Sequence, residues 1–115
     1  MSPLGVFTLF TQNPEGLGRI VRDESHQLKA IVEDRDATEE QKGINEVNSG
    51  ILVASAIELK DWLSRLSNDN AQGEYYLTDV VAMAVVDGHL VESMTTGDEY
   101  EVQGVNDKLQ LCMLE

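Results

Sequence analysis

Ile51-Leu52-Val53-Ala54, followed directly by Ser55-Ala56-Ile57-Glu58, is the stretch of the chain that decides the fold class. Its first four residues form an apolar run of strand length, which is typical of a strand covered on both faces and predicts a parallel or mixed sheet. Ser55 and Glu58 have capping-box spacing, so a helix is expected to begin there. Apolar residues then recur with helical spacing: Leu59, Trp62, Leu63 and Leu66. We therefore expect an α/β protein with Trp62 in its core.

Before this stretch, the pattern indicates strands joined by turns. Residues 6–10 are β-branched and aromatic, and the proline and glycines of residues 13–18 indicate a turn. Arg19–Arg22 and residues 27–33 are typical of two strands of a β-hairpin, joined by the polar residues 23–26. Further on, Thr38 and Gln41 match a capping box and predict a short helix, after which residues 46–50 are expected to form a loop.

After the predicted Trp62 helix comes a polar loop, residues 68–79, which is longer than joining two helices requires. Residues 80–86 are expected to form a helix, because Asp87-Gly88 places a glycine where helices commonly stop. Residues 90–94 are expected to form a strand and residues 102–105 a short extended segment. Asp107 is expected to cap a last helix with three apolar residues on one face: Leu109, Cys112 and Met113.

Composition limits the possible functions of this 115-residue chain, which is about one domain in length. Its 21 acidic and 8 scattered basic residues give a formal net charge of −13, which disfavours a nucleic-acid partner. An anionic substrate would require a divalent cation or basic groups from elsewhere. No apolar run reaches the length of a membrane span, no secretory signal is apparent, and a single cysteine, Cys112, fits a reducing cytoplasm.

Polar groups at strand ends are the candidate ligand-binding residues. They occur in the segments 16–18, 48–50 and 104–106 and at Glu33. Ligands of open α/β sheets bind at strand ends, so the asparagines could hydrogen-bond a polyol or ligate a metal through the amide oxygen. Each alone is better explained by a structural role: the glycine and asparagine segments by turn formation, and Glu33 by a solvated strand end. The sequence contains no P-loop, CxxC pair, HExxH or serine nucleophile elbow.

Taken in order, these segments resemble a known family. The matching stretches include Gly16-Leu17-Gly18-Arg19-Ile20, Ile31-Val32-Glu33, Glu46-Val47-Asn48-Ser49-Gly50-Ile51, Asn70-Ala71-Gln72-Gly73-Glu74-Tyr75-Tyr76-Leu77-Thr78-Asp79 and Gly104-Val105-Asn106-Asp107-Lys108-Leu109-Gln110-Leu111. The short stretch Asp36-Ala37-Thr38 also matches. They run collinearly across almost the whole chain, and the fourth is the most specific. The sequence resembles the second half of the uridyltransferase domain of the bifunctional bacterial N-acetylglucosamine-1-phosphate uridyltransferase and glucosamine-1-phosphate acetyltransferase.

The resemblance implies the carboxy-terminal half of a Rossmann-like nucleotidyltransferase fold, with a mixed sheet, a β-hairpin and flanking helices. In that family, UTP and N-acetylglucosamine 1-phosphate give UDP-N-acetylglucosamine and pyrophosphate for peptidoglycan and lipopolysaccharide synthesis. By the resemblance, residues 1–115 form the acceptor-sugar half of that domain, with no second domain. Asn106 would ligate Mg²⁺ through its amide oxygen. The expected sugar-pocket residues are Gly18, Glu33, Asn48, Tyr76 and Thr78, with Asn106 beside them.

The sequence also departs from the family pattern. The family's glycine-rich LxAGxGTRM loop, its uracil-contacting residues and its second Mg²⁺ ligand have no match here, and neither does its β-helical acetyltransferase domain. Leu17 stands where a tyrosine is common. We therefore expect a fragment that is inactive alone, without a catalytic residue of its own, and that self-associates unless an amino-terminal half is supplied. Another sugar-phosphate nucleotidyltransferase and a non-catalytic assembly domain remain alternatives.

Overall fold

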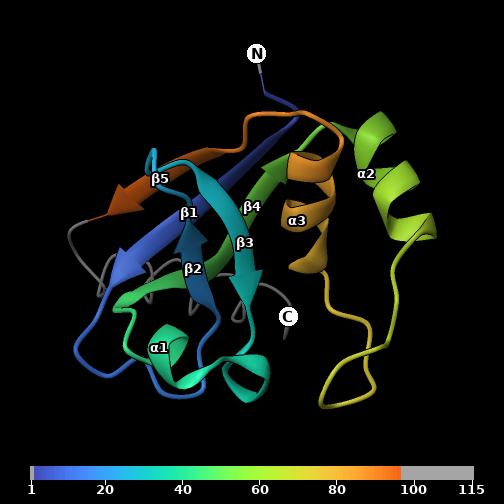
Figure 1. The fold of residues 1–115 in the computed structure, drawn as a ribbon. Coiled ribbons are helices and arrows are strands. Elements are labelled where there is room, and N and C mark those ends of the chain that lie inside the picture. The colour runs from blue at the N-terminus through green and yellow to red at the C-terminus, as the bar shows by residue number, and fades with distance from the viewer. Residues whose placement is uncertain (1, 97–115) are drawn as a thin grey trace, which may run out of the picture.

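The computed structural model describes residues 2–96 and shows a five-stranded mixed sheet with helices (Figure 1). The strand order is β3-β2-β4-β1-β5. All neighbouring strands pair antiparallel except β1 and β5, which are parallel. The strands are β1 (Leu4–Phe10), β2 (Arg19–Arg22), β3 (Leu28–Val32), β4 (Glu46–Ala54) and β5 (Glu92–Thr96). The predicted α/β class, mixed sheet and β-hairpin are confirmed.

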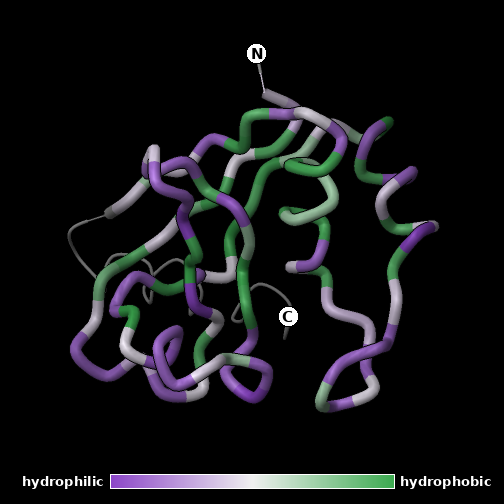
Figure 2. Tube along the Cα trace, in the orientation of Figure 1, coloured by the Kyte–Doolittle hydropathy of each residue, from purple (hydrophilic) through white to green (hydrophobic). Residues whose placement is uncertain are grey.

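Two α-helices, α2 (Ala56–Ser64) and α3 (Asp79–Val86), form the layer that packs on the sheet, with α3 against β3 (Figure 1). The main core lies between the sheet and these two helices. It contains the buried side chains of Leu4, Val6, Ile20, Ile31, Trp62, Val80 and Val81. Figure 2 shows the hydrophobic residues along the strands and α3, with hydrophilic loops at the ends of the sheet. The expected position of Trp62 in the core is confirmed. None of the described helices is long and apolar enough to cross a membrane.

The short elements between β3 and β4 are η1, a 3₁₀ turn at Asp34–Asp36, and α1 (Glu39–Lys42). Thr38 caps α1 by accepting a hydrogen bond from the Gln41 backbone, and the Gln41 side chain accepts from the Thr38 N–H at 3.0 Å. This capping box is the predicted one.

The predicted capping box at Ser55 is wrong. A capping box requires a free N–H at the N-cap residue, but Ser55 donates its N–H to the Pro3 carbonyl at 2.8 Å. This removes the bond from the Ser55 N–H to the Glu58 side chain. The Ser55 hydroxyl also makes no cap hydrogen bond, because it donates to the Glu58 carboxylate. The helix still forms, but it ends at Ser64, and Leu63, expected on its apolar stripe, is 43% exposed.

Strand β4 differs most from the sequence-based expectation. It begins at Glu46, so residues 46–50, which were expected to precede the strand, belong to it. Residues 46–48 pair with β1, and Val47 also pairs with Arg19 of β2. The expectation that residues 51–54 are covered on both faces is also wrong. Val53 is 62% exposed, because it alternates with Leu52 and Ala54, which pack on the core. Similarly, β5 begins at Glu92 rather than at residue 90, and Leu90 is 61% exposed. Residues 102–105 and the helix expected after Asp107, including Cys112, lie outside the described residues.

A buried ion pair ties β4 to its neighbours. The Arg22 guanidinium in β2 donates twice to the Glu46 carboxylate, with both distances 2.8 Å, and Thr8 in β1 donates to the same carboxylate at 2.7 Å. Glu46 and Thr8 are almost completely buried. The hydrogen bonds from Arg22 hold the pKa of Glu46 below its usual value. The carboxylate is therefore charged and satisfied in the folded protein.

The substitution Glu46→Gln tests this pair. We expect it to lower the free energy of unfolding at pH 7 by about 2 kcal/mol, because the partly buried Arg22 loses its charged partner. Since the folded pKa of Glu46 lies below its ordinary value of 4.5, its stabilisation is complete above that pH and is lost as pH falls through the folded pKa. Urea unfolding from pH 7 to pH 3 should thus show the difference between the two proteins shrinking at the acid end.

The matched control is Glu39→Gln, because Glu39 is an exposed residue in the first turn of α1. We expect a change of less than about 0.5 kcal/mol there. Equal effects of the two substitutions at pH 7 would contradict a special role for the Glu46 pair.

Candidate functional site

Three of the predicted sugar-pocket residues lie at adjacent positions across three strands. Arg19 pairs with Val32 in β3 and with Val47 in β4. Gly18, Glu33 and Asn48 each lie one position beyond these pairs, and the Asn48 N–H donates to the Gly18 carbonyl at 2.9 Å. Cross-strand neighbours point to the same face of a sheet. The hairpin and β4 thus bring Gly18, Glu33 and Asn48 together on one face.

The floor of this site is the backbone at Gly18, which is buried. A β-carbon at this position would lie 2.9 Å from Ile31 Cγ2, and 3.7 Å from both Glu33 Oε1 and Asn48 Cβ. The first distance is shorter than real side chains tolerate. The close packing of Ile31 therefore disfavours a side chain at this position, and glycine lets Ile31, Glu33 and Asn48 approach the backbone closely.

The loop between α2 and α3, which we call the α2–α3 loop (residues 65–78), contributes the other two predicted residues. The Thr78 hydroxyl, at the start of α3, donates to Glu33 Oε1 at 2.9 Å. Tyr76 is partly buried, and its hydroxyl oxygen is buried without a hydrogen-bond partner among the described residues. Burial raises the pKa of Tyr76, and the Asp36 carboxylate raises it further. Thr78 therefore contacts the group of Gly18, Glu33 and Asn48 through its hydrogen bond to Glu33. Tyr76 lies two positions earlier in the sequence.

Acidic side chains dominate the electrostatics of this corner. Burial raises the pKa of Asp79, and the nearby carboxylates of Asp36 and Glu33 raise it further. Asp36 was not among the predicted site residues, although its Oδ1 accepts the Ala71 N–H of the α2–α3 loop at 2.7 Å. The sequence signal that could have identified it is its position three residues after Glu33. An arrangement of carboxylate oxygens and neutral groups is suited to recognising hydroxyls rather than anions.

Asn106, the predicted Mg²⁺ ligand, lies outside the described residues. Within residues 2–96, no group of three or more histidine, cysteine, aspartate or glutamate side chains is placed to hold a metal ion. The predicted metal site therefore remains a prediction.

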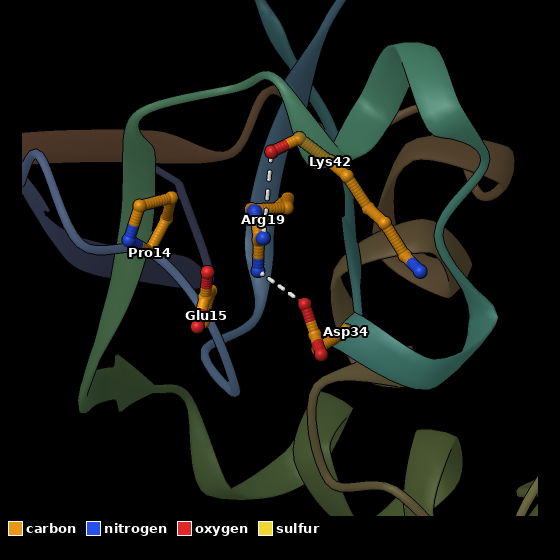
Figure 3. Close-up of a pocket in the computed structure, with 5 residues that line it drawn as sticks. All are labelled: Pro14, Glu15, Arg19, Asp34 and Lys42. Carbon is orange, nitrogen blue, oxygen red and sulfur yellow. Dashed lines mark hydrogen bonds and ion pairs between the residues drawn. The ribbon is translucent and has the colours of Figure 1, made fainter.

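A separate pocket of about 490 Å³ opens beside the start of β2 (Figure 3). Its most buried lining residue, Arg19, pairs with Asp34 at 2.9 Å and donates to the carbonyls of Leu17 and Lys42. Consecutive strand residues point to opposite faces, so Arg19 faces away from the Gly18 site. The pocket is lined by Pro14, Glu15, Arg19, Asp34 and Lys42, so two cations face two carboxylates. We interpret this pocket as the place where the ion pair and hydrogen bonds of Arg19 hold its side chain.

Comparison with known proteins identifies similar sequences. The chain is 58% identical to the bifunctional protein GlmU of Pseudomonas syringae pv. tomato, 57% to that of Pseudomonas putida and 56% to that of Pseudomonas aeruginosa. Each match covers 112 residues, which is 97% of this chain but 25% of the relative. The chain thus spans about a quarter of the length of the curated relatives that it matches. No family model matches it. The resemblance to these proteins is confirmed, and the mixed α/β sheet is compatible with part of a nucleotidyltransferase domain.

The packing at Gly18 gives a testable prediction. We expect Gly18→Ala to lower the free energy of unfolding by about 1–3 kcal/mol, because the new methyl group overlaps Ile31. In Gly5→Ala, the matched control in β1, the methyl group would meet no atom closer than 3.8 Å, so the expected change is below about 1 kcal/mol. Chemical denaturation of both variants measures the difference. Similar costs at the two positions would show that the close contact at Gly18 is absent.

Proposed function

Because the chain matches a quarter-length segment of the GlmU proteins, we propose that it forms the acceptor-sugar-binding part of a uridyltransferase. The complete enzyme would transfer uridylyl from UTP to N-acetylglucosamine 1-phosphate, giving UDP-N-acetylglucosamine and pyrophosphate for cell-wall synthesis. The observation that carries the proposal is the cross-strand grouping of Gly18, Glu33 and Asn48, with Thr78 bonded to Glu33. These four residues come from four separate parts of the chain: the start of β2, the end of β3, β4 and the start of α3.

The chemistry of the grouped residues fits a sugar. Glu33 would accept hydrogen bonds from sugar hydroxyls, as it accepts one from the Thr78 hydroxyl in this structure. Asn48 would offer an amide, which both donates and accepts. The hydroxyl of Tyr76, which has no hydrogen-bond partner within residues 2–96, is costly to bury and would gain a partner from a bound ligand.

Mg²⁺ and the nucleotide belong to the same proposal. Asn106 would hold the cation, which when bound would neutralise charge on the phosphates. The role of this chain's residues is to bind and orient the acceptor, since in-line attack by a sugar phosphate needs positioning rather than a covalent nucleophile. Phosphate binding would be helped by further cationic groups, because the formal net charge is −13 and Arg19, Arg22 and Arg65 are paired with carboxylates.

Titration of the ¹⁵N-labelled chain with N-acetylglucosamine 1-phosphate tests the binding role. We expect saturable shifts of the amide signals of Gly18, Glu33, Asn48 and Thr78. Glu33→Gln should weaken binding about tenfold, because it replaces a charged acceptor with a neutral one. Asn13→Ala, in an exposed turn, is the control and should leave binding unchanged. Tighter binding of a different sugar 1-phosphate would favour another sugar specificity, and the absence of any shift would favour a non-catalytic assembly domain.

A separate prediction concerns activity. The chain incubated with UTP, Mg²⁺ and N-acetylglucosamine 1-phosphate should form no detectable UDP-sugar, because its net charge of −13 and its paired arginines oppose binding of a triphosphate. Chromatographic detection of UDP-N-acetylglucosamine is the measurement. Robust turnover would overturn this expectation.

A further inference from the structure

The 3₁₀ turn η1, together with Glu33 just before it, is hydrogen-bonded to the α2–α3 loop at two residues, Ala71 and Thr78. Glu33 precedes η1 and Asp36 ends it, so the two carboxylates are three residues apart. Side chains with this spacing lie above one another in a 3₁₀ turn. Glu33 accepts from the Thr78 hydroxyl at 2.9 Å, and Asp36 accepts from the Ala71 N–H at 2.7 Å. The same short turn therefore holds the loop at two points seven residues apart.

The part of the loop that Asp36 holds is a compact turn of its own. Asn70 Oδ1 accepts from the backbone N–H groups of Gln72 and Glu74, both at 3.2 Å, and its side-chain nitrogen donates to the Glu74 carbonyl at 2.6 Å. Gly73 closes the turn by donating to the Asn70 carbonyl at 3.1 Å, with a positive φ of 64°. Ala71 is the second residue of this turn, and its N–H points out to Asp36. Residues 70–74 thus form one unit that Asp36 fastens to the sheet.

Tyr76 and Thr78 follow directly after this unit. Asp36 also lies close enough to Tyr76 to raise the pKa of its phenol, although burial contributes more. The position of Tyr76 is therefore determined from both sides, by the Asp36 contact at Ala71 and by the Glu33 contact at Thr78.

We infer that Asp36 is a positioning residue, whose carboxylate holds the α2–α3 loop so that Tyr76 and Thr78 face Gly18, Glu33 and Asn48. Asp36 acts through the loop and sets the affinity for the acceptor sugar. The inference rests on the proposed function for the identity of the ligand, but the contact with the loop can be measured without a ligand.

The first experiment compares Asp36→Ala with Asp36→Asn in the ¹⁵N-labelled chain. Alanine removes the acceptor, so hydrogen exchange at the Ala71 amide should accelerate about fivefold or more. Asparagine keeps an oxygen acceptor and should restore exchange to within about twofold of wild type. Asp61→Ala is the matched control, because it removes an exposed carboxylate from α2 whose partner is Arg65. Exchange at Ala71 should not change there.

Ala71→Pro removes the other partner of the same hydrogen bond. Proline suits the second position of such a turn, so residues 70–74 can keep their shape while the N–H donor is lost. We expect both Asp36→Ala and Ala71→Pro to weaken binding of N-acetylglucosamine 1-phosphate about fivefold, and the double variant to weaken it no further. Asp36→Asn should bind like wild type, which a general loss of stability would not explain. If Asp36→Ala unfolds the core, seen as loss of the dispersed methyl signals of Val80 and Val81, Ala71→Pro still tests the contact.

The results separate the two proposals. Exchange at Ala71 within twofold of wild type in Asp36→Ala would overturn the inference, and so would unchanged sugar binding in Ala71→Pro. If the wild-type chain fails to bind N-acetylglucosamine 1-phosphate, the proposed function fails, and the effect of Asp36 on affinity fails with it. In that case the exchange comparison still decides whether Asp36 holds the loop.

Discussion

A single buried carboxylate, that of Glu46, connects four of the five strands. It lies in β4, accepts from Arg22 in β2 and from Thr8 in β1, and is linked to β5 because Arg22 also donates to Ser93. Burying a charge is costly unless geometry and hydrogen bonds are nearly complete, and here the two-fold contact with Arg22 and the Thr8 hydroxyl satisfy both oxygens. The network therefore specifies how the strands align more than it adds net stability.

Strand alignment matters for the site because Glu46 and Asn48 are two residues apart and share a face of β4. A slip of one residue would turn both side chains to the opposite face. Glu46 would then lose Arg22, and Asn48 would leave Gly18 and Glu33. The ion pair and the candidate sugar site thus depend on the same strand register. A misaligned β4 would be unfavourable because the buried Glu46 carboxylate would lose Arg22.

Local hydrogen bonding could be predicted from the sequence, and long-range pairing could not. The Thr38 capping box, the hairpin and the Trp62 helix follow from residues near one another in the chain. The Ser55 capping box does not form: Pro3, 52 positions earlier, accepts the Ser55 N–H, and the Ser55 hydroxyl donates to Glu58. Likewise, nothing within residues 46–50 indicates a strand, since their pairing depends on β1 and β2. At the site, the resemblance indicated Gly18, Glu33, Asn48 and Thr78, but Asp36 emerged from its contact with Ala71.

The charge distribution constrains how an acceptor could enter. Burial and then the carboxylates of Asp36 and Glu33 raise the pKa of Asp79 in one acidic corner of the site, while the arginines of β2 are paired elsewhere. A sugar phosphate would therefore place its hydroxyls against this corner and its phosphate away from it, since the reverse orientation sets like charges together. The α2–α3 loop is unusually long and polar for a connection between two helices. Its hydrogen bonds to Glu33 and Asp36 use this length, because they hold the loop at Thr78 and at Ala71, seven residues apart, before α3 begins at Asp79.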